Sequence, residues 1–569
     1  MSEHKPRSCS PAPATPESPG RPEKRPRLEA LYDDEAVQKA AESTSNIISS
    51  TNNNGAKSKK PSRRNRKQKH ALPEPYSPEF VIAKDVENLL GKKAVEQAIG
   101  DGTEWDAPLE QKEEIQVTVS CLSSTGDALC LVPARHKPWA IVAPLALPGE
   151  TIRVRVYKHA RLYSHADLLD VVTPNPEWRD MDRVQCKYFG KCAGCQYQML
   201  SYKKQLDLKR DVVVKAYQNF SNLPESAITP IGTTIASPLE YGYRTKITPH
   251  FDAPPKSAQK AGAVDSENPP DWLKIGFNQV GTRKVMDIEE CPIATPTLNE
   301  SLGPLRKNII EKIHTYKKGV SLLLRDSLEI PPTQANESQK FTDILTSSSE
   351  KHVCVTDHKG TVRERVGDKL FEYVAGSFFQ NNNSVLLPLT SYVRDAIFPP
   401  SSTIADPSSH TARPRPTHLV DAYCGSGLFA LTLAPHFGTV AGIELSADSI
   451  RSATHNAALN GLTNCRFMAG DAAHIFDTVQ DFPRAETVLI IDPPRKGTDE
   501  RFIEQLLAFA CETVVYVSCN VHTQARDVGM ILRKSEERDG RRYVLETLRG
   551  FDLFPQTAHV ESVAVLRLE

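Results

Sequence analysis

Beyond residue 416, short apolar runs alternate regularly with longer amphipathic stretches. Six runs have the length and the β-branched content of strands, and the segments between the first five have helical spacing. These six runs are LVDAY, VAGIEL, CRFMAG, TVLIID, TVVYVSC and SVAVLRL. Strands that alternate with helices predict a doubly wound, mostly parallel α/β sheet of the Rossmann-like kind, and we place this domain at 376–569.

A different pattern lies upstream, where five β-type runs are separated by turn residues such as Gly126-Asp127 and Pro148-Gly149. The runs are IQVTVSCL, DALCLVP, WAIVAPLA, ETIRVRVYK and DLLDVVTP. They predict a small antiparallel barrel at 110–172, after a short helical pattern near 80–100. Barrels of this size often bind single-stranded nucleic acid, although a fold alone does not establish that role.

The rest of the chain divides into a central domain and a tail. Residues 182–375 form a mixed α/β stretch interrupted by a Pro/Ser/Ala-rich insertion at 252–271. A second insertion, rich in Pro, Ser and Thr, spans 400–416. Residues 1–85 lack an apolar period and are rich in Pro, Ser, Asn, Lys and Arg, which predicts a disordered tail.

The tail carries two basic clusters, Lys24–Arg27 and Lys59–Lys67, which serve either nuclear import or attraction to RNA, or are simply solvated. No apolar run is long enough to cross a membrane, and the N-terminus lacks a secretory signal. We therefore expect a protein of the nucleus or cytoplasm, with the mitochondrion left open. The formal net charge is zero, so an RNA-binding surface must be a local patch.

Three strand ends in the last domain carry candidate cofactor residues. A glycine-rich turn, Asp421 to Gly427, follows the first strand and leads into a helix, and Glu444 ends the next strand. Such a carboxylate is placed to bind both ribose hydroxyls of an adenosine. A nicotinamide dehydrogenase would look similar, but the turn lacks the third glycine of G-x-G-x-x-G. The sequence Asp492-Pro493-Pro494-Arg495 at another strand end favours a methyltransferase that uses S-adenosylmethionine.

The strand VVYVSCN ends in Cys519, beside the expected ligand crevice. A thiolate there could add to carbon 6 of uracil, activate carbon 5 toward a sulfonium methyl group, and be eliminated after a base removes the carbon 5 proton. Glu561 is the candidate base, because burial raises a carboxyl pKa toward neutrality. His559 is an alternative base or orients Glu561. A cation such as Arg495 or Arg526 would assist the thiolate.

These motifs resemble the RNA uracil-5-methyltransferases, and most closely the fungal branch that acts on tRNA. The resemblance covers 110–569 and rests on four ordered motifs, DAYCGSG, IDPPRKG, VYVSCN and FPQTAHVE. It implies that Cys519 is the nucleophile and Glu561 the proton acceptor. It also implies that Gln380, Tyr423, Glu444 and Asp492 contact S-adenosyl-L-methionine.

The same resemblance implies that the barrel is an RNA-binding TRAM module. The implied substrate is the T-loop uridine 54 of tRNA, and the implied product is 5-methyluridine. Because bacterial relatives that act on rRNA also carry the barrel, rRNA stays open as a substrate. We expect a monomer that needs no protein partner.

Four cysteines of the central domain form a further candidate site, Cys186, Cys192, Cys195 and Cys291. Four thiolates commonly hold an iron–sulfur cluster, and zinc is the rival. A C-x5-C-G-G-C…C-P pattern binds a [4Fe–4S] cluster in the bacterial rRNA relatives, which this chain resembles with Ala193 for the first glycine. The remaining alternative is four buried thiols without a metal. The segment Tyr241–Lys246 interleaves aromatic and cationic residues and is either an RNA contact or an ordinary strand.

Other functions were weighed against the motifs. A cytosine-5-methyltransferase would carry a cysteine after the proline of its fourth motif, and an adenine-N6 enzyme would carry an aromatic residue there. Arg495 follows the prolines here, which disfavours both. An RNA-binding or tRNA-folding chaperone that has lost catalysis is disfavoured by intact Cys519, Asp492 and Glu561, although both roles can coexist.

Overall fold

The computed structural model describes residues 71–133, 137–256, 258, 269–329, 350–399, 414–470, 476, 478–538 and 540–569. The first elements are helices α2 (Pro78–Leu90) and α3 (Lys92–Gly100). Ser77 caps α2 by accepting a hydrogen bond from the Phe80 amide at 3.3 Å. The predicted tail boundary at residue 85 is therefore wrong, because ordered structure already begins before α2. The two basic clusters lie outside the described residues.

Five strands close into a barrel in the order β1-β2-β3-β5-β4. They are β1 (Glu114–Leu122), β2 (Ala128–Leu131), β3 (Ala140–Ala143), β4 (Thr151–Ala160) and β5 (Tyr163–Thr173). Exposed and buried residues alternate along β1 and β4, as expected for strands that fill a barrel with every second side chain. The prediction of an entirely antiparallel barrel is wrong at one pair, because β3 runs parallel to β5.

The central region is a set of short strands around two long helices. Its helices are α4 (Tyr202–Phe220) and α5 (Pro296–Lys312). Its strands are β6 (Lys246–Ile247), β7 (His250–Phe251), β8 (Gly276–Asn278), β9 (Val285–Asp287), β10 (Val320–Ser321), β11 (Leu324–Leu328) and β12 (His352–Val355). They form two small sheets, ordered β10-β7-β8-β9 and β12-β11-β6.

The next hairpin, β13 (Thr361–Val366) and β14 (Lys369–Val374), belongs with the C-terminal domain. Its Val362 and Phe371 share a hydrophobic core with Leu419 and Val440 of the C-terminal sheet. The domain boundary expected at 376 therefore moves toward the N-terminus, because burial of this hairpin depends on that sheet.

A seven-stranded sheet forms the C-terminal domain in the order β17-β16-β15-β18-β19-β21-β20. The strands are β15 (His418–Ala422), β16 (Thr439–Glu444), β17 (Cys465–Ala469), β18 (Thr487–Ile491), β19 (Thr513–Ser518), β20 (Tyr543–Phe551) and β21 (Glu561–Leu568). The first five pair in parallel, whereas β21 is antiparallel to both β19 and β20. The mostly parallel, doubly wound sheet is thus as predicted, with β20 as an additional strand.

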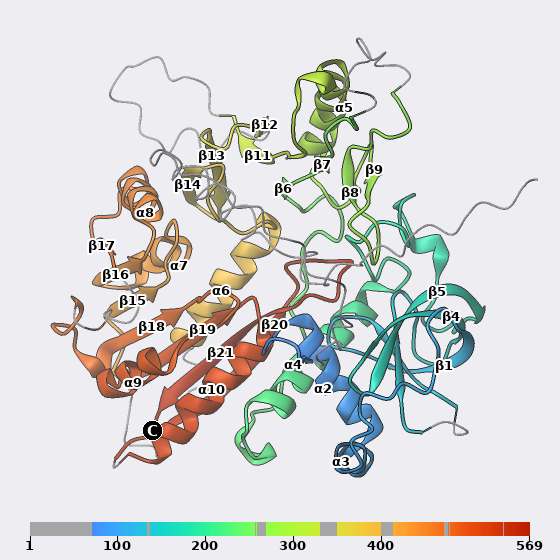
Figure 1. Ribbon diagram of the computed structural model, residues 1–569. Coiled ribbons are helices and arrows are strands. Elements are labelled where there is room, and N and C mark those ends of the chain that lie inside the picture. Colours follow the sequence, from blue (N-terminus) through green and yellow to red (C-terminus); the bar gives the residue numbers. More distant parts are fainter. Residues whose placement is uncertain are drawn as a thin grey trace, which may run out of the picture.

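Helices α6 (Leu386–Ile397), α7 (Leu428–Leu433), α8 (Ala447–Leu459), α9 (Glu500–Phe509) and α10 (Val521–Glu536) accompany this sheet. One predicted helix differs, since the described residues of 470–486 include 3-10 turns, at 476 and 478 and at Arg484–Glu486, and no α-helix. Figure 1 shows the C-terminal sheet and the barrel on opposite sides of the molecule, with α2 and α4 between them. None of the helices in the described ranges is both long and apolar enough to span a membrane.

Candidate active site

Cys519 follows the last residue of β19, at the carboxyl edge of the parallel strands. The antiparallel register of β19 and β21 ends with Ser518 opposite Ser562. Continued by one position, the same register places Cys519, which follows Ser518, opposite Glu561, which precedes Ser562. Directly opposed residues of an antiparallel pair present their side chains on the same face of the sheet. The structure thus brings the predicted nucleophile and the predicted base together.

The thiol of Cys519 lies in a buried, negatively charged environment. Burial first, and then the charges of Glu561 and Asp492, together raise its pKa to about 12 against the opposing effect of Arg495. The carbonyl of Arg495 accepts hydrogen bonds from Asn520 Nδ2 at 2.9 Å and from Thr523 Oγ1 at 3.0 Å. These bonds anchor Arg495 to the first turn of α10, next to Cys519. Arg495 is therefore the cation that favours the thiolate.

Arg526 was the other cation expected beside the thiol, and the structure places it elsewhere. Its guanidinium pairs with Asp527 at 2.6 Å and donates to the Lys496 and Thr498 carbonyls. It also lies 4.9 Å from the centre of the Tyr76 ring. Arg526 joins α10 to the start of α2 and has no role at Cys519.

The carboxyl group of Glu561 is buried, and the partly exposed carboxyl group of Asp492 lies close enough to influence it. Burial raises the pKa of Glu561 to about 8 and the pKa of Asp492 to about 7. The charge of Asp492 contributes to the shift at Glu561, and Arg495 opposes it. A base with a pKa near the working pH is well matched to proton abstraction. The environment of Glu561 therefore suits the role predicted for it.

His559 differs from Glu561 in its charge state. Burial lowers the pKa of this imidazole to about 3, and Arg495, Lys209 and other nearby cations lower it further. Its ring packs edge-on against Phe554, with 5.0 Å between ring centres. His559 is thus neutral at physiological pH and packs in the loop before β21, so Glu561 is the better candidate base.

Three predicted cofactor residues meet at the ends of adjacent strands. In the parallel register, Ala422 of β15 pairs with Ile443 of β16 and with Ile491 of β18. The next residues along these strands are Tyr423, Glu444 and Asp492. Glu444 accepts hydrogen bonds from the Gly425 amide at 3.3 Å and from the Ser446 amide at 2.9 Å. The glycine turn and the carboxylate are thereby joined into one edge.

The backbone and polar atoms of this edge fit an adenosine-bearing ligand. Tyr423 has a φ of 63°, a strained value for a residue with a side chain. Among the described residues, buried Asp421 Oδ1, Ser426 Oγ and Asn381 Oδ1 have no hydrogen-bond partner. Buried polar atoms are usually paired, so these atoms are available to a bound ligand.

Gln380 lies in a buried loop that approaches from the hairpin β13–β14. Arg325, itself fully buried, donates to the Ser377 and Phe379 carbonyls at 3.2 and 3.3 Å. Asn382 donates to the Leu553 carbonyl at 3.1 Å. The loop with Gln380 is therefore tied to the segment before Glu561, and Gln380 itself is 6% exposed.

The four predicted cluster cysteines lie within electrostatic reach of one another. Burial raises the pKa of Cys195, and its three partners raise it further. Within the described ranges, however, no group of three or more His, Cys, Asp or Glu residues is arranged to hold a metal ion. This finding applies to zinc and to an iron–sulfur cluster alike, so the arrangement of the described side chains favours neither over the other.

The segment Tyr241–Lys246 serves the fold more than an RNA surface. Tyr243 is 2% exposed, and its hydroxyl donates to the Pro555 carbonyl at 3.0 Å. The guanidinium of Arg244 lies 5.7 Å from the centre of the Phe554 ring. The RNA-contact interpretation is wrong for Tyr243, because its ring is buried and its hydroxyl is bound.

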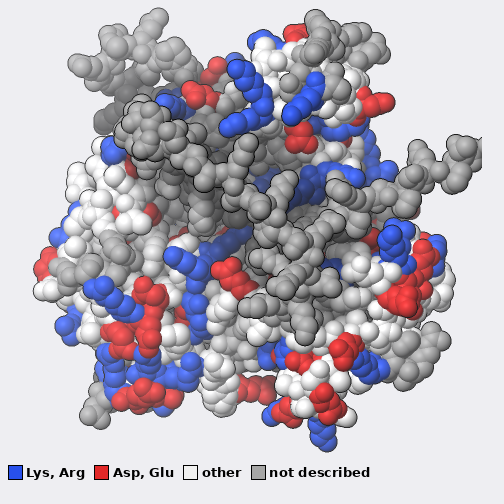
Figure 2. Space-filling model, in the orientation of Figure 1, with Lys and Arg blue, Asp and Glu red and all other residues white. Residues whose placement is uncertain are grey.

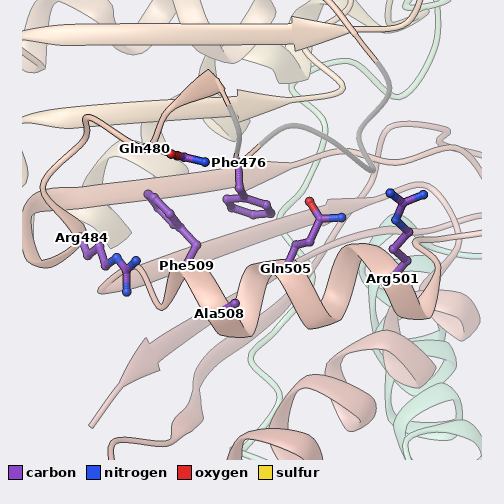
Figure 3. Close-up of a pocket in the computed structure, with 7 residues that line it drawn as sticks. All are labelled: Phe476, Gln480, Arg484, Arg501, Gln505, Ala508 and Phe509. Carbon is purple, nitrogen blue, oxygen red and sulfur yellow. The ribbon is translucent and has the colours of Figure 1, made fainter.

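A hollow of about 600 Å³ runs along α9, away from these groups. Figure 3 shows its lining, which is Phe476, Gln480, Arg484, Arg501, Gln505, Ala508 and Phe509. None of the predicted catalytic or cofactor residues belongs to that lining. The hollow is therefore separate from the candidate active site.

Sequence patterns did not single out the residues that support the catalytic loop. Lys209 of α4 and Asp552 are both fully buried, and their charged groups are 2.5 Å apart. Each is an ordinary charged residue when the sequence is considered alone. Only the contact between α4 and the loop identifies them.

Known proteins resemble this chain in sequence and in fold. A family model described as tRNA (Uracil-5-)-methyltransferase matches residues 332–568. The tRNA (uracil(54)-C(5))-methyltransferase of Schizosaccharomyces pombe is 42% identical, covering 93% of this chain and 90% of that protein. The protein of the same name from Saccharomyces cerevisiae is 38% identical, covering 90% and 84%.

A solved structure has a similar fold, that of Pyrococcus abyssi tRNA (uracil-54, C5)-methyltransferase in complex with S-adenosyl-L-homocysteine. It has a TM-score of 0.52 and 22% identity, and the match covers 79% of this chain and 100% of that chain. This likeness concerns the fold, whereas the identity and extent of the two yeast relatives show that the chain belongs to the tRNA (uracil-5-)-methyltransferase family.

Proposed function

We propose that this chain transfers a methyl group from S-adenosylmethionine to carbon 5 of uridine 54 in the T-loop of tRNA. The product is 5-methyluridine. The observation that carries the proposal is the position of Cys519 opposite Glu561, with Asp492 and Arg495 beside them. The names of the two yeast relatives support tRNA as the substrate.

Cys519 is the proposed nucleophile and Glu561 the proposed proton acceptor. The thiolate forms a bond to carbon 6 of the uracil, and the electron pair of the C5–C6 double bond makes carbon 5 nucleophilic. After methylation, Glu561 takes the proton from carbon 5. The electrons of that C–H bond restore the double bond as the C6–S bond breaks, and the thiolate leaves.

Burial in this site holds Cys519 as a thiol until the substrates arrive. Its raised pKa follows from burial and from the two carboxyl groups. Arg495 is the chain's own group that stabilises the thiolate. Because Glu561 has a pKa of about 8, most molecules keep this proton at neutral pH, and the deprotonated fraction is the competent base.

Gln380, Tyr423, Glu444 and Asp492 are proposed to hold S-adenosylmethionine, with Glu444 binding the ribose hydroxyls. When bound, this cofactor supplies an electrophilic methyl group on a sulfonium. The unpartnered polar atoms of Asp421, Ser426 and Asn381 support a ligand at this edge. The loop with Gln380 would close over it from the hairpin side.

A tRNA substrate has to reach a buried thiol. Figure 2 shows Lys and Arg side chains across the middle of one face, between the C-terminal sheet and the barrel. Such cations attract phosphates without regard to sequence. We propose that the barrel is a TRAM-type RNA-binding module and that the target uridine leaves its stack to reach Cys519.

Incubation of unmodified tRNA transcripts with the protein and S-adenosylmethionine, followed by mass spectrometry of nucleosides, tests the proposal. We expect 5-methyluridine at one position, and a transcript with cytidine at position 54 should yield none. Absence of the product from a protein that binds S-adenosylhomocysteine would overturn the proposal. A product formed only on rRNA fragments would move the activity to that substrate.

The four cysteines are proposed to hold a [4Fe–4S] cluster that organises the central region. Their proximity supports this, since such clusters are held by four thiolates. Methylation of uracil is redox-neutral, so the proposed role is structural. Iron and acid-labile sulfide in anaerobically purified protein test it, and the absence of both would leave four buried thiols.

The basic clusters near the N-terminus are proposed to direct nuclear import, which deletion of Lys59–Lys67 in a fluorescent fusion would test.

A further inference from the structure

The loop that leads to Glu561 is held by distant parts of the chain as well as by hydrogen bonds of its own. This loop, residues 552–560, connects β20 to β21 and ends one residue before Glu561. We call it the base loop. Its position fixes where the first residue of β21 emerges, and therefore where the Glu561 carboxyl group lies relative to Cys519.

One attachment comes from Lys209 of α4. Its ammonium group, which is fully buried, contacts Asp552 Oδ1 at 2.5 Å and donates to the Phe554 carbonyl at 2.9 Å. The two acceptors lie at the start of the base loop. A buried charge is costly unless it is paired, so separation of the Lys209 ammonium group from the Asp552 carboxylate would leave two unpaired buried charges. This cost keeps the start of the base loop against α4.

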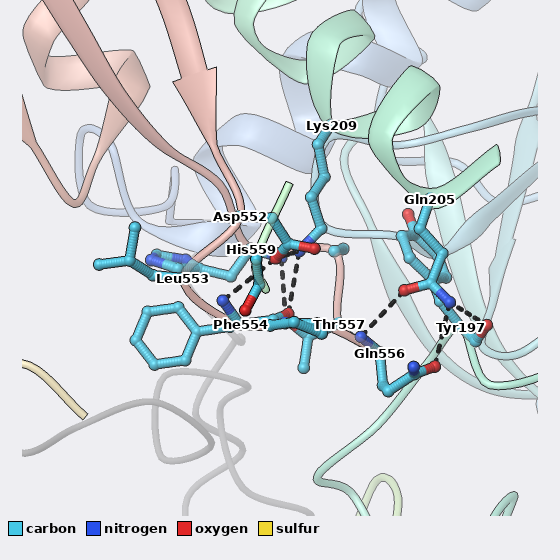
Figure 4. Close-up of polar contacts among 12 residues, drawn as sticks. Tyr197, Gln205, Lys209, Asp552, Leu553, Phe554, Gln556, Thr557 and His559 are labelled. Atoms are coloured by element: carbon cyan, nitrogen blue, oxygen red, sulfur yellow. Dashed lines mark hydrogen bonds and ion pairs between the residues drawn. The ribbon is translucent and has the colours of Figure 1, made fainter. Parts of the chain in front are cut away.

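A second attachment comes from Gln205, one turn earlier on the same helix. Its Oε1 accepts from the Gln556 amide at 2.9 Å, and its Nε2 donates to Gln556 Oε1 at 3.0 Å. Gln556 has a φ of 71°, which a side-chain-bearing residue adopts only when its surroundings hold it there. Figure 4 shows Gln205 and Lys209 reaching the base loop from α4. Residues four apart share one face of a helix, which explains the joint contact.

Two further regions of the chain, the cysteine segment and the barrel, also contact the base loop. The Gln556 carbonyl accepts from the amides of Gln196 and Tyr197, at 2.9 and 3.0 Å, directly after Cys195. Gly126, in the turn between β1 and β2 of the barrel, has room for no side chain, because a Cβ there would lie 2.7 Å from Ala558 Cβ. The cysteine segment and the barrel thus both touch the base loop.

We propose that Gln205 and Lys209 are positioning residues of the methylation reaction, which hold the base loop so that Glu561 faces the substrate carbon above Cys519. The inference rests on the proposed roles of Cys519 and Glu561. Neither Gln205 nor Lys209 contacts the reacting atoms in this account. Both act through the loop that carries the base.

This arrangement makes proton removal from carbon 5 the step of the reaction that is most sensitive to loss of the Gln205 and Lys209 contacts. Addition of Cys519 and transfer of the methyl group depend on β19 and the cofactor edge, to which Gln205 and Lys209 donate no hydrogen bond within the described residues. The base loop also accepts a hydrogen bond from Asn382, two residues after Gln380, so its misplacement affects the cofactor edge less directly than it affects Glu561. Proton removal from carbon 5 depends on the placement of Glu561. When that placement is lost, the electrons of the C5–H bond are not released, the C6–S bond stays intact, and methylated RNA remains covalently attached to Cys519.

The test uses full-length protein, unmodified tRNA transcript and S-adenosylmethionine labelled in its methyl group. The variants are Gln205→Ala and the double variant Lys209→Met with Asp552→Asn, which removes both charges so that neither is buried alone. The reaction is quenched in SDS, and labelled RNA that migrates with the protein on a denaturing gel is measured. We expect the adduct fraction to rise about 10-fold and kcat to fall by about the same factor, because small misplacements of a catalytic group are costly. The KM for tRNA should fall together with kcat.

The controls separate this inference from the proposed function. Lys203→Met alters the same helix at a side chain that is 85% exposed and pairs only with Asp207, and it should behave as the unaltered protein. Glu561→Gln should accumulate adduct, and failure to do so would overturn the proposed role of Glu561 and this inference with it. Two outcomes would overturn the positioning role alone, provided that Glu561→Gln accumulates adduct. In the first, both α4 variants show an unchanged adduct fraction. In the second, both variants lose adduct, turnover and S-adenosylhomocysteine binding together.

Discussion

Cys519 and Glu561 occupy opposed positions at the end of the antiparallel pair β19–β21, one residue beyond Ser518 and Ser562. The two groups are close enough that the Glu561 carboxylate raises the pKa of the thiol. The pair lies where the antiparallel strand β21 packs beside β19, the last of the parallel strands. The proposed nucleophile and the proposed base are thus supplied by two neighbouring strands of one sheet.

Replacement of Cys519 by Ala should abolish methylation and leave cofactor binding intact. Without the thiolate, carbon 5 of uracil is not activated, and we expect kcat to fall by at least about 10³-fold. Nucleoside analysis measures the product, and calorimetry with S-adenosylhomocysteine measures binding. Cys465→Ala is the matched control, since Cys465 lies on the edge strand β17, which β16, β15 and β18 separate from β19. Activity of the Cys519 variant within about 10-fold of the unaltered protein would contradict covalent catalysis by this thiol.

The rate should rise with pH through the titration of Glu561. A base acts in its deprotonated form, and the pKa of Glu561 is about 8. At limiting concentrations of both substrates, kcat/KM should therefore fall by about tenfold per pH unit below pH 7. Because Asp492 interacts with Glu561, the apparent pKa belongs to the pair.

Asp492→Asn provides the control for this profile. Removal of the negative neighbour lowers the pKa of Glu561, so the midpoint of the profile should move to lower pH even though the variant is slower. A profile that is flat between pH 6 and 9 would argue against Glu561 as the titrating base.

Glu561 should also make the fold less stable at high pH. Its pKa in the folded state is about 8, above the ordinary value of 4.5, so the folded protein keeps a proton that the unfolded chain has lost. Stability therefore falls as pH rises from about 4.5 to about 8. Glu561→Gln should match the unaltered protein at pH 5 and unfold at a temperature about 2–6 °C higher at pH 9.

Thermal unfolding followed by circular dichroism measures this difference, with exposed Glu225→Gln as the control. An equal melting temperature for Glu561→Gln and the unaltered protein at pH 9 would show that Glu561 is not held in its protonated form by the fold.

Two glycines in helices should respond to Ala with opposite signs. A Cβ at Gly529 of α10 would lie 1.9 Å from the Ser221 carbonyl oxygen at the end of α4, so the two helices would have to separate. We expect Gly529→Ala to destabilise the protein by about 1–3 kcal/mol. Gly303 of α5 has no atom within 4 Å of its Cβ position, and Gly303→Ala should stabilise by up to about 1 kcal/mol. Chemical denaturation measures both, and a neutral Gly529→Ala would contradict the tight contact between α4 and α10.

The cofactor edge could be predicted from the sequence, because its residues follow directly from strand order. Tyr423, Glu444 and Asp492 each come after an apolar run, and parallel strands bring their carboxyl ends to one edge. Cys519 was predicted in the same way. The barrel was also recognised from alternation, but the parallel pairing of β3 and β5 was not, since alternation is identical for both strand directions.

The helix α2 shows where local pattern was insufficient. Residues up to 85 were assigned to the tail from their composition, yet Tyr76 and Phe80 pack against Phe220, with ring centres 5.8 and 6.1 Å apart. The helical pattern begins only at Phe80, and Tyr76 stands before it among Pro, Ser and Glu residues, where it gives no period. Their burial depends on the end of α4, a partner that is distant in the sequence.

The sequence by itself determined the chemistry of this protein, since the types and order of residues at the strand ends define a cofactor edge, a thiol and a carboxyl group. The tertiary structure decided how those groups act on one another. Burial and the proximity of Asp492 and Arg495 set the pKa values of Cys519 and Glu561. The contacts of Gln205 and Lys209 with the base loop likewise arise only when α4 packs against it, because neither residue is near that loop in the chain.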